Sequence, residues 1–142
     1  MILVDANILL YAAIDAYPQH ERAHSWLDEQ LSGHTAVGLP WESLLAFARV
    51  STNPRLFQKP LSLAEAWGQI RAWIEARRVW IPQPSESHAE FLGKLLECAG
   101  QGANLVSDAH LAAIAMGHGL VLCSSDGDFA RFPGLRWMNP LR

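Results

Sequence analysis

Acidic side chains at four places in the chain have the types and positions expected of a divalent metal site. Asp5 follows the apolar run MILV, Glu42 lies in PWES, Asp108 lies in VSDAH, and Asp126 and Asp128 lie in SSDGDF. Carboxylates held close together raise one another's pKa unless a positive charge sits among them. Hard cations such as Mg²⁺ and Mn²⁺ prefer oxygen ligands and keep water in an open site. The acids therefore predict such a site, provided that the fold brings them together.

Each acid also has a simpler structural interpretation when it is taken alone. Asp5 can cap a helix that starts near Asn7, and Asp126 can cap a short turn over DGDFARF. Glu42 and Asp108 fall where a helix is expected to begin, and the helix dipole favours an acid there. For any single acid the structural interpretation is preferred, and only the set as a whole favours metal binding.

The elements that must position these acids alternate along the chain. Short apolar runs predict strands, with the last as a candidate fifth strand, over residues 1–4, 35–39, 79–82, 120–124 and 135–138. Helical periodicity predicts helices over residues 7–14, 20–31, 41–50, 62–76, 86–100 and 107–119. This alternation indicates an α/β fold with a mainly parallel sheet of four to five strands, covered by helices on both faces. Ligands of such sheets bind beyond the carboxyl ends of the strands, where the acids are expected.

Local signals sharpen two of these helices. Ser62 and Glu65 form the pattern of a capping box, and the apolar stripe that follows includes Trp67 and Trp73, both of which are expected in the core. Ser107 is predicted as the N-cap of the last long helix, and Gly119 as its stop signal.

Composition sets the class of protein. The chain has 142 residues, half of them hydrophobic, and shows no linker or repeat, so we expect one domain over residues 1–142. The net charge of −3 speaks mildly against a nucleic-acid ligand, unless a bound metal neutralises the clustered acids. Cys98 and Cys123 form no metal motif, and no apolar run approaches the ~20 residues of a membrane helix. We expect a cytoplasmic protein with no membrane partner.

One motif points to a different chemistry. HERAH, at residues 20–24, fits H-E-x-x-H, in which two histidines bind zinc and the glutamate acts as a base. His20 and His24 follow the same line along the helix as its apolar residues, so they are expected at the rim of the core. A zinc protease also needs a third ligand from another element, and only Glu42 is a candidate. A zinc protease is therefore a remote alternative.

The other histidines carry no clear metal signal. His34, His88, His110 and His118 have no metal-ligand spacing among themselves. His110 lies two residues after Asp108 and can approach the acids, but a position on the helix surface is the favoured interpretation.

Four segments together resemble the acidic motifs of a known family. VDANILLYA, WESLLAFARVSTNPRLF, NLVSDAHLAAIAMGHG and SSDGDFARFPGLRWMNPL are similar, in order, to the motifs of the PIN domain, and most closely to those of the VapC toxins of bacterial toxin-antitoxin pairs. The resemblance runs from residue 1 to about residue 141. It implies a PIN-like three-layer α/β/α sandwich.

The resemblance also implies roles for individual residues. The positions that match the catalytic acids of the family are Asp5, Glu42, Asp108 and Asp126. Metal ligands are expected at Asp5, Asp108 and Asp126, with Asp128 matching an additional acid of many members, while Asn7 and Ser125 match supporting polar positions. A threonine that is familiar in the family, two residues before Asp126, is Ser124 here, which keeps a hydroxyl.

The implied activity is that of an endoribonuclease that cleaves structured RNA, either transfer RNA or ribosomal RNA, and depends on Mg²⁺, with Mn²⁺ able to substitute. A metal ion can activate water for such hydrolysis without any histidine pair, and Glu42 either binds the ion or assists the attacking water. The implied partners are a cognate VapB-like antitoxin, whose C-terminal segment presents an arginine to the acids, and a second copy of the chain in a homodimer. A PIN module that binds RNA or protein without cleavage is the main alternative.

Overall fold

The computed structural model describes residues 1–100 and 102–142, and it is built around a parallel sheet. The strands are β1 (Ile2–Val4), β2 (Val37–Gly38), β3 (Val79–Trp80), β4 (Val121–Cys123) and β5 (Trp137–Met138). Their order is β3-β2-β1-β4-β5, and each neighbouring pair is parallel. The predicted α/β class with a mainly parallel sheet is confirmed.

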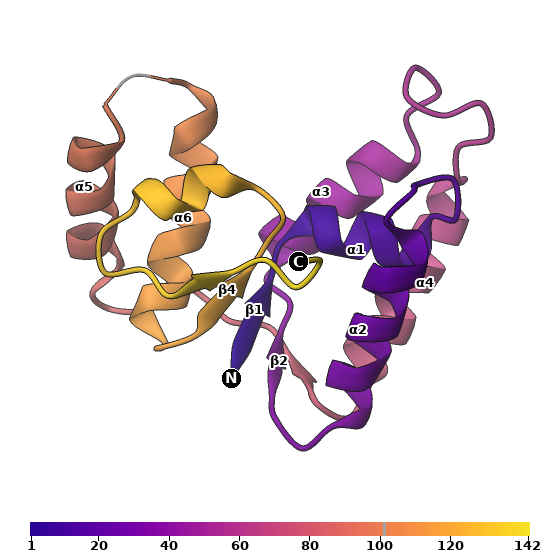
Figure 1. Cartoon of the computed structure of the whole chain (residues 1–142), viewed down its shortest axis with the longest axis horizontal. Coiled ribbons are helices and arrows are strands. Elements are labelled where there is room, and N and C mark those ends of the chain that lie inside the picture. The colour runs from indigo at the N-terminus through magenta and orange to yellow at the C-terminus, as the bar shows by residue number, and fades with distance from the viewer. Residues whose placement is uncertain (101) are drawn as a thin grey trace.

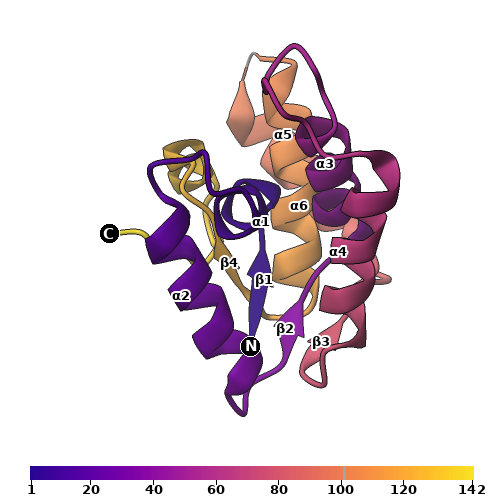
Figure 2. The same cartoon turned by 90° about the vertical axis from the view of Figure 1, so that its right-hand side faces the viewer.

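Helices cover both faces of this sheet. They are α1 (Ala6–Ala13), α2 (His20–Ser32), α3 (Trp41–Ser51), α4 (Leu63–Glu75), α5 (His88–Ala99) and α6 (Asn104–Gly117), followed by the 3-10 helix η1 (Gly127–Arg131). In Figure 1, α1 to α4 lie on one side of the strands, and α5, α6 and the segment after β4 lie on the other. Figure 2 turns the side of α1 to α4 toward the viewer, and the strands are seen there between α2 and α4. The α/β/α layering is therefore confirmed.

The alternation of side chains along β1 explains the two layers. Leu3 and Val4 are both fully buried, but they belong to different clusters. Leu3 packs with residues of α5 and α6, whereas Val4 packs with residues of α1 to α4. Successive residues of a strand point to opposite faces of the sheet, so one short apolar strand contributes to both cores.

The order of the strands places a crevice between β1 and β4. From the carboxyl end of β1 the chain passes through α1 and α2 to β2 on one side, whereas from the carboxyl end of β4 it passes through η1 to β5 on the other side. Val4 is paired with Cys123 at the carboxyl ends of these two strands. Connections that leave adjacent strands in opposite directions open a ligand-binding crevice at that point. The next residues of the two strands, Asp5 and Ser124, lie at this crevice.

Helix α4 matches its predicted start. Ser62 accepts a hydrogen bond from the backbone N–H of Glu65, and the Glu65 carboxylate accepts one from the backbone N–H of Ser62. Trp73 is buried as predicted, but the prediction for Trp67 is wrong, since its side chain is 47% exposed and stacks on Trp41. Ala66, Ile70 and Trp73 form the inward stripe, and position 67 is rotated away from it.

Helix α6 begins three residues earlier than predicted. It starts at Asn104 rather than at Ser107, because Leu105 is buried and extends the apolar face by another turn. Ser107 is therefore not its N-cap, and Asp108 lies beyond the first turn. Gly119, at φ +66°, follows the end of α6 as expected. Among the described residues, no helix has the length and apolar character needed to cross a bilayer.

Candidate functional site

Asp5 is fixed at the end of β1 by hydrogen bonds to both of its carboxylate oxygens. Oδ1 accepts from the backbone N–H of Ala6 at 2.8 Å, so Asp5 caps α1. Oδ2 accepts from the hydroxyl of Ser124 at 2.7 Å. The side chain predicted as a helix cap is thus also held against the end of β4. Its orientation is set by two elements that are adjacent only in the folded sheet.

Ser124 makes several hydrogen bonds at the carboxyl end of the sheet. Its hydroxyl is fully buried, accepts hydrogen bonds from the Asn7 amide at 3.1 Å and from the backbone N–H of Asp126 at 3.0 Å, and donates to Asp5. Ser125 contacts the side-chain oxygen of Asn7 through its backbone N–H at 3.5 Å. The hydroxyl of Ser124 therefore makes the hydrogen bonds to the acids. The sequence had assigned the supporting role to the next residue, Ser125.

Three further acids lie close to Ser124. Carboxylate oxygens of Asp108, Asp126 and Asp128 lie within 4.8 Å of one another. Asp126 begins η1, and its Oδ1 accepts from the backbone N–H of Asp128 at 2.9 Å. Asp108 reaches the group from α6. Two segments that are distant in the sequence thus supply one compact set of oxygen ligands.

The electrostatics of this cluster favour a cation. The pKa of Asp108 is raised from 3.8 to about 6, first by burial and then by the charges of Asp126, Asp5 and Asp128. Burial also raises the pKa of Asp5, against the opposing effect of its hydrogen bonds, and Asp126 adds to the increase. Like charges that raise one another's pKa are stabilised when a positive ion binds among them. Both the ligand type and the charge therefore fit a hard divalent cation.

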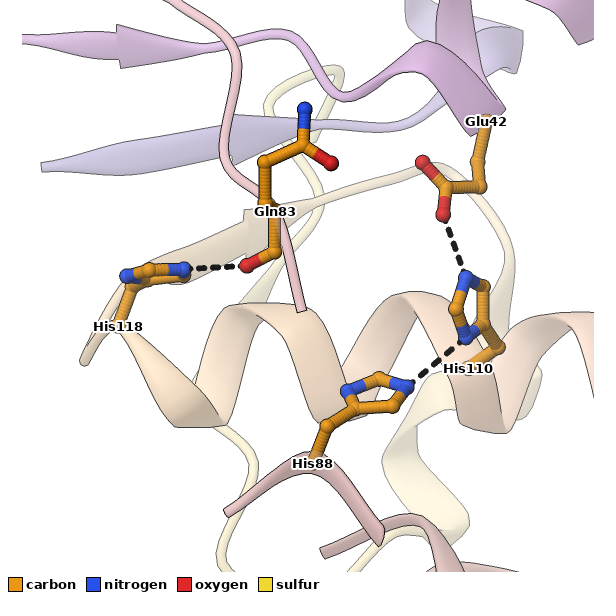
Figure 3. Close-up of polar contacts among 5 residues, drawn as sticks. All are labelled: Glu42, Gln83, His88, His110 and His118. Atoms are coloured by element: carbon orange, nitrogen blue, oxygen red, sulfur yellow. Dashed lines mark hydrogen bonds and ion pairs between the residues drawn. The ribbon is translucent and has the colours of Figure 1, made fainter. Parts of the chain in front are cut away.

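Glu42 lies across a small cavity from these acids. It is in the first turn of α3, as predicted, and it lines a cavity of about 180 Å³ together with Asp5, Ser107 and Asp108. Its carboxylate bonds to Nε2 of His110 at 2.5 Å (Figure 3). Glu42 is not one of the three acids whose oxygens cluster. It faces the cluster from α3, the helix on the other side of the cavity.

A larger groove adjoins this cavity between α3 and α6. Its volume is about 640 Å³, and its lining shares Glu42 and Ser107 with the smaller cavity. Arg49 contributes a guanidinium group, while Leu45 and Val106 contribute exposed apolar side chains. The acids thus lie at one end of an open groove that has both a cationic and an apolar lining.

His88 and His110, for which no role was predicted, belong to the same region. His110 Nδ1 and His88 Nε2 are 3.0 Å apart, and the two rings are nearly perpendicular. His110 is about one-third exposed and also approaches the site, the alternative that the sequence left open, because its ring bridges Glu42 of α3 and His88 of α5. Burial lowers the pKa of His88, and His110 lowers it further. No sequence signal relates positions 42, 88 and 110, because only the packing of α3, α5 and α6 brings them together.

HERAH lies away from this region. Nδ1 of His20 is 2.9 Å from the backbone carbonyl of Tyr11, and Nδ1 of His24 is 3.2 Å from that of Ala12. The candidate third ligand, Glu42, is bonded to His110 instead. Over residues 1–100 and 102–142, the aspartate cluster is the one group of three potential metal ligands within reach of one another. The geometry therefore gives no support to a zinc protease.

Sequence comparison agrees with the motifs. Residues 2–135 match the PIN domain family. Ribonuclease VapC37 of Mycobacterium tuberculosis is 44% identical over 140 residues, which cover 99% of this chain and 97% of that protein. Ribonuclease VapC33 of the same organism is 39% identical over 142 residues, which cover 100% of this chain and 99% of that protein. These similarities extend over the whole length of both relatives.

Structural comparison adds the fold. A chain of the VapBC2 crystal structure from Rickettsia felis, bound to a DNA fragment from its promoter, matches with a TM-score of 0.70 at 21% identity and covers 98% of both chains. The crystal structure of Mycobacterium tuberculosis VapC20, described as a Sarcin-Ricin loop cleaving toxin, matches with a TM-score of 0.68 at 16% identity and covers 96% of this chain and 99% of that one. From its motifs, its fold and these relatives, the chain belongs to the PIN domain family and, within it, to the VapC proteins.

Proposed function

We propose that this protein is a metal-dependent endoribonuclease and the toxin of a toxin-antitoxin pair, with residues 1–142 forming a single PIN-like domain. One observation carries the proposal. Asp108, Asp126 and Asp128 cluster beside the crevice between β1 and β4, and Asp5 lines the same cavity as Asp108, in a chain that is 44% identical to Ribonuclease VapC37 over 99% of its length. The proposed substrate is structured RNA, either transfer RNA or ribosomal RNA.

The proposed metal ligands are Asp5, Asp108 and Asp126, with Asp128 as a further ligand. The clustering of three of these acids within 4.8 Å and the raised pKa values of Asp5 and Asp108 support this assignment. Mg²⁺ is the proposed ion, with Mn²⁺ as a substitute, because both accept an all-oxygen ligand set and retain water ligands.

The other side chains of the site have separate proposed roles. When bound, a divalent cation makes water a stronger nucleophile and stabilises negative charge on the phosphodiester. Glu42, on the opposite wall of the cavity, either binds the ion or orients the attacking water. Asn7 and Ser125 are proposed to support the acids, together with the hydroxyl of Ser124, which fixes the carboxylate of Asp5.

The groove between α3 and α6 is the proposed path of the RNA. Arg49 can pair there with a phosphate at a short distance from the acids. Metal-assisted hydrolysis does not require the 2′-hydroxyl, so the choice of RNA over DNA rests on contacts to the shape and sugars of the RNA.

The proposed partners are a VapB-like antitoxin and a second copy of the chain. Structures similar in fold include the VapBC2 complex from Rickettsia felis and VapBC-1 from nontypeable Haemophilus influenzae, which supports an antitoxin partner. We propose that an antitoxin arginine reaches the clustered acids, whose charge it would neutralise. The proposed site of action is the cytoplasm, where Cys98 and Cys123 remain free thiols.

Chelation distinguishes this function from its alternatives. The purified chain, freed of any co-purifying antitoxin, is treated with EDTA and assayed for RNA cleavage after addition of Mg²⁺, Mn²⁺ or Zn²⁺. We expect cleavage to stop in EDTA and to return with Mg²⁺ or Mn²⁺. Peptide cleavage restored by Zn²⁺ alone would identify a zinc protease. RNA binding without cleavage under all metal conditions would identify a non-cleaving module.

A further inference from the structure

A chain of three side chains connects the candidate site to α5. Glu42 of α3 bonds to Nε2 of His110 on α6, and Nδ1 of His110 bonds to Nε2 of His88 on α5. Figure 3 shows the ring of His110 between the two partners, with each of its nitrogens directed at one of them. His110 is about one-third exposed, so the Glu42 contact lies at the edge of the site rather than in open solvent.

The chemistry of Glu42 fixes the direction of these hydrogen bonds when both imidazoles are neutral. An ionised carboxylate can only accept, so Nε2 of His110 must carry the proton that it donates to Glu42. Nδ1 of His110 is then a lone-pair acceptor, and Nε2 of His88 must donate to it. His88 Nδ1, which is buried and has no partner among the described residues, is left as an acceptor and not as an unpaired N–H group. One tautomer therefore satisfies both bonds.

The position of Glu42 makes this chain relevant to the chemistry. Its side chain lines the cavity that Asp5 and Asp108 also line, and it is 38% exposed. A partly exposed glutamate loses rotamer freedom only if a specific contact holds it. Among the contacts of Glu42, the short bond to His110 supplies that restraint.

We propose that His110 is a positioning residue that holds the carboxylate of Glu42 toward the metal-binding acids, and that His88 fixes the tautomer in which His110 can do so. This inference rests on the proposed ribonuclease function. It extends the site from the acidic set to two histidines on α5 and α6. His110 acts through Glu42 and needs no contact with the RNA or the metal ion.

A double-mutant cycle tests the first part. Single-turnover cleavage in Mn²⁺ is compared for wild type, His110→Ala, Glu42→Asp and the double variant, since the shorter aspartate keeps a carboxylate but cannot reach His110. We expect His110→Ala to slow cleavage roughly ten- to hundredfold in the wild-type background, as for loss of a hydrogen bond to a charged group, with the enzyme concentration at half-saturation and the cleavage sites unchanged. In the Glu42→Asp background we expect no further loss. An equal loss in both backgrounds, or none in either, would overturn the proposal.

A conservative variant separates positioning from packing. The amide of His110→Gln can donate to Glu42 while its oxygen accepts from His88, so we expect its cleavage rate within about threefold of wild type. If His110→Gln is as slow as His110→Ala while both unfold at the wild-type temperature, a hydrogen-bonding role is excluded.

A spectroscopic measurement tests the chain without any cleavage assay. Long-range ¹H–¹⁵N spectra of the metal-free protein near neutral pH report which ring nitrogen of each histidine carries a proton. We expect a proton on Nε2 and none on Nδ1 for both His110 and His88, and loss of the single tautomer of His110 in Glu42→Ala. A proton on Nδ1 of His110 would overturn the role of His88. If wild type cleaves no RNA, the proposed function fails, and these spectra still decide whether the hydrogen-bonded chain exists.

Discussion

Asp5 has both a structural role, as a helix cap, and a proposed chemical role, as a metal ligand. It caps α1, accepts a hydrogen bond from Ser124, and faces the cavity that Asp108 and Glu42 also line. A helix cap needs only an oxygen acceptor, whereas a metal ligand needs negative charge. The two roles can therefore be separated by a substitution that keeps the oxygen and removes the charge.

The variant Asp5→Asn makes this separation. We expect cleavage to fall by about a hundredfold or more, since even partners behind metal ligands contribute 10- to 100-fold. The metal-free protein should stay folded, with its free energy of unfolding changed by no more than about 1–2 kcal/mol, because the amide removes a charge that burial disfavours but replaces one of the two accepting oxygens with a donor. Initial rates of RNA cleavage and urea unfolding in EDTA measure the two effects. Cleavage at the wild-type rate would remove Asp5 from the proposed site.

The variant Ser124→Ala tests the role of the buried Ser124 hydroxyl. The substitution removes a hydroxyl that bonds to Asp5, Asn7 and the backbone of Asp126, so we expect a loss of about 1–3 kcal/mol in the free energy of unfolding. Cleavage should fall as well, because Asp5 loses the contact that orients it. Ser124→Thr, which restores the hydroxyl, is the matched control and should recover both stability and cleavage. If the alanine variant is as active as wild type, Ser124 does not position the acid.

The raised pKa of Asp108 predicts a dependence of stability on pH. The folded state favours the protonated acid, so its stabilising contribution is complete below pH 3.8 and is lost as pH rises through about 6. In EDTA, we expect wild type to lose stability relative to Asp108→Asn over this window. Urea unfolding of both proteins at several pH values measures the difference. Two parallel stability profiles would show that Asp108 does not carry the raised pKa.

At the scale of residues, the sequence was sufficient to single out the acids but not their surroundings. Asp5 and Asp126 each follow a strand, and parallel strands end at one edge of the sheet, so their proximity follows from local patterns. The bond from Ser124 to Asp5 spans 119 positions, and that from His110 to Glu42 spans 68. The first contact depends on which strands pair and the second on how α3 and α6 pack, and no local pattern encodes either.

At the scale of elements, the signals that predicted correctly are those complete within a few residues. The capping box of α4 is such a signal, because Ser62 and Glu65 satisfy each other's backbone N–H groups. The start of α6 was misplaced because Ser107 has the chemistry of a cap, while the burial of Leu105 favours an earlier turn. Tertiary packing decided between these two local preferences.

Ser62→Ala provides a prediction for the element alone. Loss of the cap should lower the free energy of unfolding by about 1 kcal/mol and the melting temperature by about 3 °C. RNA cleavage should be unchanged, since α4 supplies no residue to the acidic cluster or to the two cavities beside it. Ser62→Thr keeps the capping box and serves as the control in thermal unfolding. A loss of cleavage at a temperature where the alanine variant is folded would contradict this separation of roles.

At the scale of the whole molecule, topology converts dispersed acids into one site. Because the chain leaves β1 through α1 and α2 toward β2 and leaves β4 through η1 toward β5 on the other side, residues near positions 5 and 126 meet at a single crevice. A cation bound among Asp108, Asp126 and Asp128 would offset part of the net charge of −3, which makes the acidic composition compatible with an RNA substrate.

The most direct test of the central claim is cleavage of total RNA by the purified chain, freed of antitoxin, in Mg²⁺ or Mn²⁺ beside the variant Asp108→Asn. We expect discrete RNA fragments from wild type and none from the variant, with both proteins folded. Identical fragments from both proteins would contradict a nuclease site built on the aspartate cluster.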